Sequence, residues 1–136
     1  MTSGSPNTSD FDSSSNPWLV RQKLFVASLQ HQPLLLVIRP EPDDLEASGS
    51  GSSGLLEQVQ QLHAAGLRHL EVAWDQPGWI GFMQRVQDHC PELNLGAASV
   101  TVAKALNDLS RLDLSYAMSP CWCPELVEQA RGLGVL

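Results

Sequence analysis

The chain has 136 residues, of which 43% are hydrophobic, and a formal net charge of −7 at pH 7. This length suits one domain, and the acidic balance argues against general nucleic-acid or anionic-membrane binding, because those partners select clustered lysine and arginine. The chain has no apolar run of the roughly 18 residues that a membrane-spanning helix needs, and its start lacks the features of a signal peptide. We therefore expect a cytoplasmic protein, and an odd set of three cysteines fits a reducing compartment.

The amino-terminal part divides into a polar tail and a helical pattern. Residues 1–16 are almost all Ser, Thr, Asp, Asn, Gly or Pro. This composition is too polar to bury a core, so we expect a disordered tail over 1–16 and one domain over 17–136. Pro17 suits the first turn of a helix, and apolar residues follow it at near-helical spacing. We expect this leading helix to cover one end of the core.

A short apolar run over residues 34–39, ended by Pro40, is typical of a strand that is buried on both faces. A Gly/Ser-rich segment follows at residues 47–54. A phosphate-binding loop would need a Gly-Lys-Ser/Thr sequence or the GxGxxG spacing, and neither is present. The segment is better interpreted as a flexible surface insertion.

Three further strands are predicted, and each is followed by a helix or a turn into one. The predicted strands are 69–74, 93–100 and 114–118, the predicted helices are 55–65, 79–90, 102–112 and 124–131, and residues 132–136 look like the start of a fifth strand. Repeated βα units predict an α/β fold with a parallel sheet and right-handed crossovers. A doubly wound sheet would be complete at this length, whereas a (β/α)8 barrel needs at least about 200 residues. In a barrel, this chain would supply four to five βα units, which is half of the structure.

Glu71 is a charged residue inside the second predicted strand. Alternation along a strand places it on the face opposite Leu70 and Val72. A buried carboxylate is costly unless it is paired or hydrogen-bonded, so Glu71 needs a cationic or hydrogen-bond-donating partner. The sequence offers no clear lysine, because Lys23 and Lys104 both lie on helical patterns.

The cysteines and histidines do not predict a metal site. Cys121 and Cys123 are two residues apart, and combining them with His89 and Cys90 gives no second matched pair at zinc-site spacing. We interpret them as ordinary thiols and expect neither a metal nor a cofactor.

Four motifs occur in order along the chain. They are "PLLLVIR", which ends at Arg39, "AGLRHLEVAW" around Glu71, "LGAASV" with Ser99, and "MSP" at Ser119 and Pro120. In sequence and order they resemble the first four βα units of the 2-keto-3-deoxy-6-phosphogluconate/4-hydroxy-2-oxoglutarate aldolase family. The resemblance covers about residue 33 to the end, and it implies half of a (β/α)8 TIM barrel.

The resemblance implies a class I aldolase, in which a lysine forms a Schiff base with a 2-keto acid and the carbon–carbon bond breaks to give pyruvate and an aldehyde. It implies that Glu71 is the general acid/base, that Arg39, Ser99, Ser119 and Pro120 contact the substrate, that no cofactor is used, and that the protein is a homotrimer. The family's lysine lies on the sixth strand, and its phosphate-binding loops follow the seventh and eighth. None of these strands has a counterpart in this sequence, so we expect the chain alone to be inactive.

Two family positions differ in this chain. Asp75 stands where the family often has arginine, which would weaken the binding of an anionic substrate. Ala98 replaces the second glycine of a Gly-Ala-Gly motif, which would narrow the site.

Two other functions stay open. The chain could be a non-catalytic βα assembly or regulatory module derived from the barrel, since four barrel strands leave two unpaired edges that favour pairing with another chain. It could also be a flavodoxin-like domain that binds a phosphorylated ligand, although no recognisable phosphate loop follows the first strand.

Overall fold

The computed structural model describes residues 16–45, 54–75 and 77–136. Its elements are, in order, α1 (Pro17–His31), β1 (Leu36–Ile38), α2 (Pro42–Leu45), α3 (Gly54–Ala64), β2 (His69–Ala73), α4 (Trp79–His89), β3 (Asn94–Ala98), α5 (Ala103–Arg111), β4 (Tyr116–Ala117) and α6 (Pro124–Gly132). The strands pair in sequence order, and every pair is parallel. The predicted α/β class with repeated βα units is therefore confirmed.

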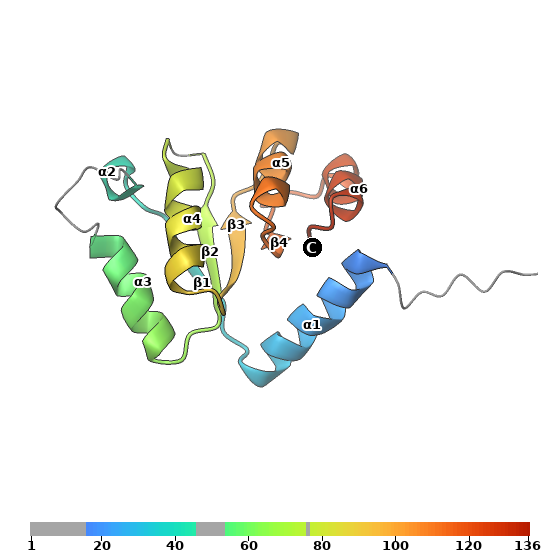
Figure 1. Ribbon diagram of the computed structural model, residues 1–136. Coiled ribbons are helices and arrows are strands. Elements are labelled where there is room, and N and C mark those ends of the chain that lie inside the picture. The colour runs from blue at the N-terminus through green and yellow to red at the C-terminus, as the bar shows by residue number, and fades with distance from the viewer. Residues whose placement is uncertain (1–15, 46–53, 76) are drawn as a thin grey trace, which may run out of the picture.

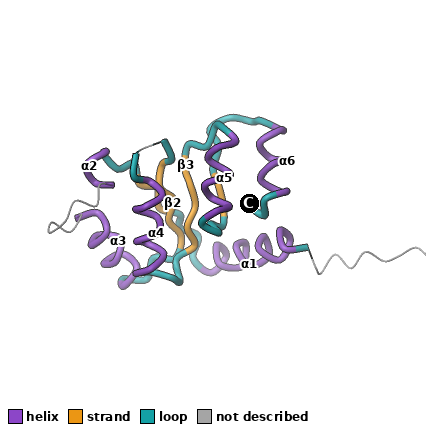
Figure 2. The backbone as a smooth tube through the Cα atoms, turned by 45° about the horizontal axis from the view of Figure 1, so that its top comes forward, coloured by secondary structure: helices purple, strands orange, loops and turns teal. Residues whose placement is uncertain are grey.

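Helices α3 to α6 lie along one face of the sheet (Figures 1 and 2). The main hydrophobic core fills the space between these helices and the strands; its strand members include Leu70, Val72, Leu95 and Ala97. Successive residues on a strand point to opposite faces. Glu71 and its neighbours in register therefore face the other side of the sheet, which we call the inner face.

Two glycines in the left-handed region lie between β2 and the helices on either side of it in the chain. Gly66 has a φ of +112° just after α3, and Gly78 has a φ of +84° at the amino-terminal cap of α4. Residues other than glycine adopt such φ values at a cost. The two glycines lie next to the helices predicted over 55–65 and 79–90, which are confirmed as α3 and α4, and all five residues of β2 are buried, as expected for a strand covered on both faces.

Helix α1 crosses the amino-terminal ends of the strands (Figure 1). The Trp18 indole donates a hydrogen bond to the carbonyl of Val135 at 3.0 Å, and the Arg21 guanidinium donates to the carbonyls of Gly134 and Leu114 at 2.8 and 3.2 Å. Gly134 and Val135 follow α6, and Leu114 lies just before β4. The expectation that this helix covers one end of the core is therefore confirmed.

The edges of the sheet differ from the predictions. The first strand is not buried on both faces as predicted, because β1 is an edge strand and its central residue Val37 is 44% exposed. The predicted fifth strand is also wrong in extent, since Gly132 belongs to α6. Leu136 alone takes up strand-like pairing: its amide donates to the carbonyl of Ser115 at 3.1 Å, and its carbonyl accepts from the amide of Ala117 at 2.9 Å.

Most of the predicted tail and insertion lies outside the described residues. At their boundaries, Asn16 caps α1 by accepting a hydrogen bond from the Trp18 amide at 3.0 Å, and Gly54 is the first residue of α3. The short helix α2 was not expected from the sequence. Among the helices of the described ranges, none is both long and apolar enough to cross a bilayer.

Candidate active site

Four of the residues that the sequence points to lie just beyond strand ends. Arg39 follows β1 directly, Ser99 follows β3 directly, and Ser119 and Pro120 come shortly after β4. The carboxyl ends of parallel strands share one edge of a sheet, and ligands of α/β proteins bind at that edge. The order of the strands therefore gathers these residues on the side of the molecule opposite α1.

Arg39 and Ser99 are brought into direct contact. The Nη1 atom of Arg39 donates a hydrogen bond to the Ser99 hydroxyl at 2.8 Å. Both residues line a cleft of about 580 Å³ at the carboxyl edge of β1, β2 and β3, together with Ala73, Trp74 and Thr101. A guanidinium keeps further donors free after one such bond, which suits a carboxylate ligand. Asp75 lines the same cleft. Its negative charge would repel a bound anion there.

Glu71 lies deeper, on the inner face in the middle of β2. Glu71 is only 4% exposed, and its Oε2 atom has no hydrogen-bond partner among the described residues. Burial raises the pKa of this carboxyl, while the positive charge of Arg39 opposes the rise. A carboxyl group with a raised pKa is suited to giving and taking protons in general acid/base catalysis.

Tyr116 is an inner-face residue that the sequence interpretation missed. The register places Glu71, Gly96 and Tyr116 side by side on β2, β3 and β4. Tyr116 is only 1% exposed, and its hydroxyl also lacks a partner among the described residues. Burial raises the Tyr116 pKa, and the negative charge of Glu71 raises it further. No pattern within one strand specifies its register with the next, so the sequence carried no signal for this neighbour.

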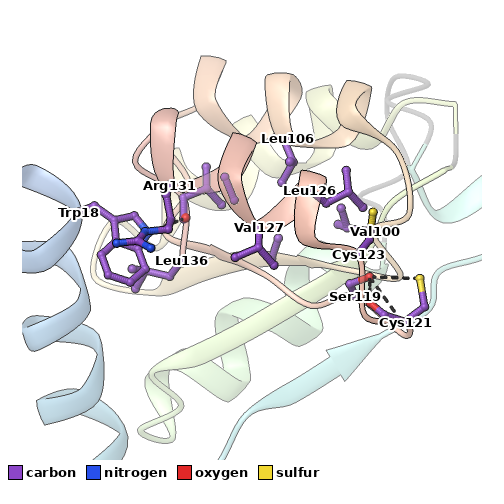
Figure 3. A pocket seen from close by; sticks show the side chains of 13 residues that line it. Trp18, Val100, Leu106, Ser119, Cys121, Cys123, Leu126, Val127, Arg131 and Leu136 are labelled. Atoms are coloured by element: carbon purple, nitrogen blue, oxygen red, sulfur yellow. Dashed lines mark hydrogen bonds between the residues drawn. The ribbon is translucent and has the colours of Figure 1, made fainter.

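Ser119 and Pro120 do not join the cleft that Arg39 and Ser99 line. The Ser119 hydroxyl donates to the carbonyl of Cys121 at 2.9 Å, and Pro120 is exposed. Ser119 instead lines a mostly apolar cavity of about 130 Å³ between α1, β4 and α6, shown in Figure 3. Contact of these two residues with a substrate stays a prediction.

Both lysines of the sequence fall within the described ranges, and both lie on helices. Lys23 is exposed on α1, and Lys104 lies on α5, where its Nζ atom is 3.1 Å from the Asp108 carboxylate. Neither lysine lies on a strand of the sheet. In the described part of the chain, no three His, Cys, Asp or Glu side chains are grouped so that they could hold a metal ion.

No protein-family profile and no curated protein sequence matches the chain. In three dimensions it is similar to a solved structure described as "Native KDPGal structure", with a TM-score of 0.58 and 20% sequence identity. The match covers 76% of this chain and 46% of that one, so the chain spans less than half the length of this structural relative. The parallel sheet and its helices thus have a fold similar to part of an aldolase barrel.

We predict that replacing Glu71 with glutamine stabilises the chain at neutral pH. Burial raises the Glu71 pKa above the ordinary value of 4.5, so the folded state holds this proton more tightly than the unfolded state does. The stability that Glu71 contributes is therefore complete below pH 4.5, and it is lost as the pH rises through the raised pKa. Glu71→Gln should accordingly unfold at a higher urea concentration than the wild type at pH 7, and the gap should close below pH 4.5.

Urea unfolding followed by circular dichroism across this pH range measures the effect. Glu128→Gln is the matched control, because Glu128 is exposed on α6. If Glu71→Gln and Glu128→Gln shift the pH profile equally, Glu71 is not a buried carboxyl with a raised pKa.

Proposed function

We propose that this chain supplies the amino-terminal half of a Schiff-base aldolase barrel that cleaves a 2-keto-3-deoxy sugar acid, a phosphorylated form of it, or 4-hydroxy-2-oxoglutarate. The observation that carries the proposal is the position of Glu71. It is a buried carboxyl with a raised pKa on the inner face of a sheet whose fold is similar to that of a KDPGal aldolase. The resemblance of the sequence motifs to the aldolase family implies that its general acid/base corresponds to this same residue.

In this proposal the catalytic lysine comes from a segment outside these 136 residues. Its amine adds to the substrate ketone to form a carbinolamine, which loses water to give the protonated imine. The substrate's 4-hydroxyl then loses its proton, the bond between carbons 3 and 4 breaks, its electron pair moves to the imine to give an enamine, and the aldehyde leaves. The enamine takes up a proton at carbon 3 and becomes the imine of pyruvate. Glu71 gives a proton to the departing hydroxyl of the carbinolamine and takes one back when water returns to release pyruvate.

Arg39 and Ser99 have the chemistry to bind the substrate carboxylate. Their hydrogen bond fixes the guanidinium at the carboxyl edge of the sheet. Strand β2, which carries Glu71 on its inner face, ends at the same edge. A charge-assisted hydrogen bond from arginine to a carboxylate is about twice as strong as a neutral one. Orientation of the 2-keto acid by these two residues would present its ketone to the lysine.

A fusion protein tests this function. Residues 17–136 would be joined to the carboxy-terminal half of a KDPGal aldolase barrel, and pyruvate release from 2-keto-3-deoxy acids would be followed with coupled lactate dehydrogenase. We expect activity that falls by about 100-fold or more in Glu71→Gln, a typical loss on removing a general acid/base. A fusion that unfolds cooperatively but releases no pyruvate would count against the proposal.

The isolated chain provides a second test. We expect no covalent adduct after incubation with pyruvate and borohydride, because Lys23 and Lys104 lie on helices and Lys104 is paired with Asp108. Intact-mass spectrometry reads the result, and the active fusion is the positive control. An adduct on the isolated chain would show that a Schiff-base lysine is already present in it.

A non-catalytic assembly module is the second candidate. It is favoured by exposed apolar side chains along α1, the segment after it and the edge strand β1, namely Val20, Leu24, Val26, Leu34 and Val37. Leu24 is 68% exposed, and an apolar surface of this kind marks an interaction site. This candidate predicts a stable homo-oligomer of the isolated chain, measured by size-exclusion chromatography with light scattering, together with an inactive fusion.

A further inference from the structure

The inner face holds two buried polar atoms that lack partners among the described residues. They are the Oε2 atom of Glu71 and the hydroxyl oxygen of Tyr116. Both residues are more than nine-tenths buried. Buried polar groups in native proteins almost always bond to protein or to an ordered water molecule. Two such groups at the same register on one face of the sheet therefore point to a shared ligand.

The packing around Tyr116 directs its hydroxyl toward β2. Its ring lies over Gly96 of the intervening strand, so closely that a Cβ atom at Gly96 would be 2.7 Å from the ring carbons Cδ2 and Cε2. On its other side the ring stacks on Phe25 of α1, with centroids 4.6 Å apart. The ring thus reaches from β4 across β3, and the next strand in that direction carries Glu71 at the same register.

We propose that Glu71 and Tyr116 together bind one buried water molecule on the inner face, and that Tyr116 is a positioning residue for Glu71. A water molecule can donate one hydrogen bond to the carboxylate and accept one from the phenol, which satisfies both atoms. Arg39, which directly follows β1, is the charged group that acts on Glu71, and its Nη1 atom donates a hydrogen bond to the Ser99 hydroxyl.

The water site does not depend on the proposed aldolase reaction. Only its use as the proton carrier for Glu71 rests on that function. The site can therefore be tested on the full 136-residue chain without substrate, and a negative result would leave the aldolase proposal to be judged by the fusion protein alone.

The first measurement is the pKa of Glu71 from the carboxyl ¹³C chemical shift, which is assigned with Glu71→Gln. Tyr116→Phe keeps the ring over Gly96 and removes only the hydroxyl. If that hydroxyl orders the water on the carboxylate, its loss should raise the Glu71 pKa further, by about one unit. Ser115→Ala is the matched control, because it removes a hydroxyl from the residue just before β4 rather than from the Tyr116 ring, and it should leave this pKa unchanged.

The second measurement is the nuclear Overhauser effect between water and the ring protons of Tyr116 in the wild-type chain. A long-lived water at the site should give this signal, and Glu71→Ala should abolish it. A raised pKa in Tyr116→Phe together with the water signal supports the proposal. An unchanged pKa overturns the positioning role, and a raised pKa without a water signal shows a direct contact between the two side chains and overturns the water site.

Discussion

Gly96→Ala is expected to lower the free energy of unfolding by about 3 kcal/mol, which is the upper range for overpacking a core. Gly96 lies in the central strand β3, where an added Cβ atom would be 2.6 Å from the Tyr116 carbonyl oxygen and 2.7 Å from the Tyr116 ring. A backbone atom cannot move aside without breaking the pairing of β3 with β4, and the ring is held by Phe25. Relief of the overlap must therefore disturb the inner face.

Urea unfolding measures this loss, and Gly81→Ala is the control. Gly81 lies in helix α4, and a Cβ atom there would meet only the Arg85 side chain at an ordinary 3.7 Å. Alanine favours a helix interior over glycine by about 1 kcal/mol, so this variant should be slightly more stable than the wild type. Equal effects of the two substitutions would show that the Tyr116 ring does not occupy the space over Gly96.

His69→Ala is expected to cost about 3 kcal/mol, comparable to the loss of a large buried side chain. His69 is completely buried at the start of β2. Its Nδ1 atom is 3.0 Å from the Leu34 carbonyl, which can only accept, so Nδ1 donates and Nε2 accepts from the Ser28 hydroxyl at 2.7 Å. The ring also packs edge-to-face on Phe25. One side chain therefore joins α1, the segment before β1, and β2.

Thermal unfolding tests this prediction against His89→Ala. His89 is exposed, and its ring makes a local hydrogen bond to the Arg85 carbonyl at 2.7 Å. We expect that substitution to change stability by no more than about 0.5 kcal/mol. A small effect of His69→Ala would mean that α1 is held to the sheet mainly by Trp18 and Arg21.

Substitution of His69 and substitution of Glu71 should separate the stability of the fold from its proposed chemistry. His69 lies where the strands begin, next to α1, whereas Arg39 and Ser99 lie where the strands end. In β/α barrels, residues at the first end serve stability and those at the second end serve chemistry. In the proposed aldolase, loss of His69 should therefore lower the amount of folded protein, and loss of Glu71 should lower the turnover of protein that is folded.

Local patterns in the sequence determined the order of the elements. Apolar runs predicted the βα repeat and the helices over 55–65 and 79–90, which correspond to α3 and α4. Alternation along the second strand placed Glu71 opposite Leu70 and Val72, and the structure shows this arrangement. These features depend on residues that are near each other in the chain, so a single sequence contains enough information to predict them.

The tertiary structure decided what depends on distant segments. The exposure of Val37 follows from the edge position of β1, and the hydrogen bond from Arg39 to Ser99 follows from the parallel register of strands that are far apart in sequence. The same register brings Tyr116 to Glu71, because the ring can cross β3 only where Gly96 leaves space for it. Alternation along the strand predicts which face of the sheet Glu71 occupies. Its neighbours on that face are determined only by the packing of three strands and α1.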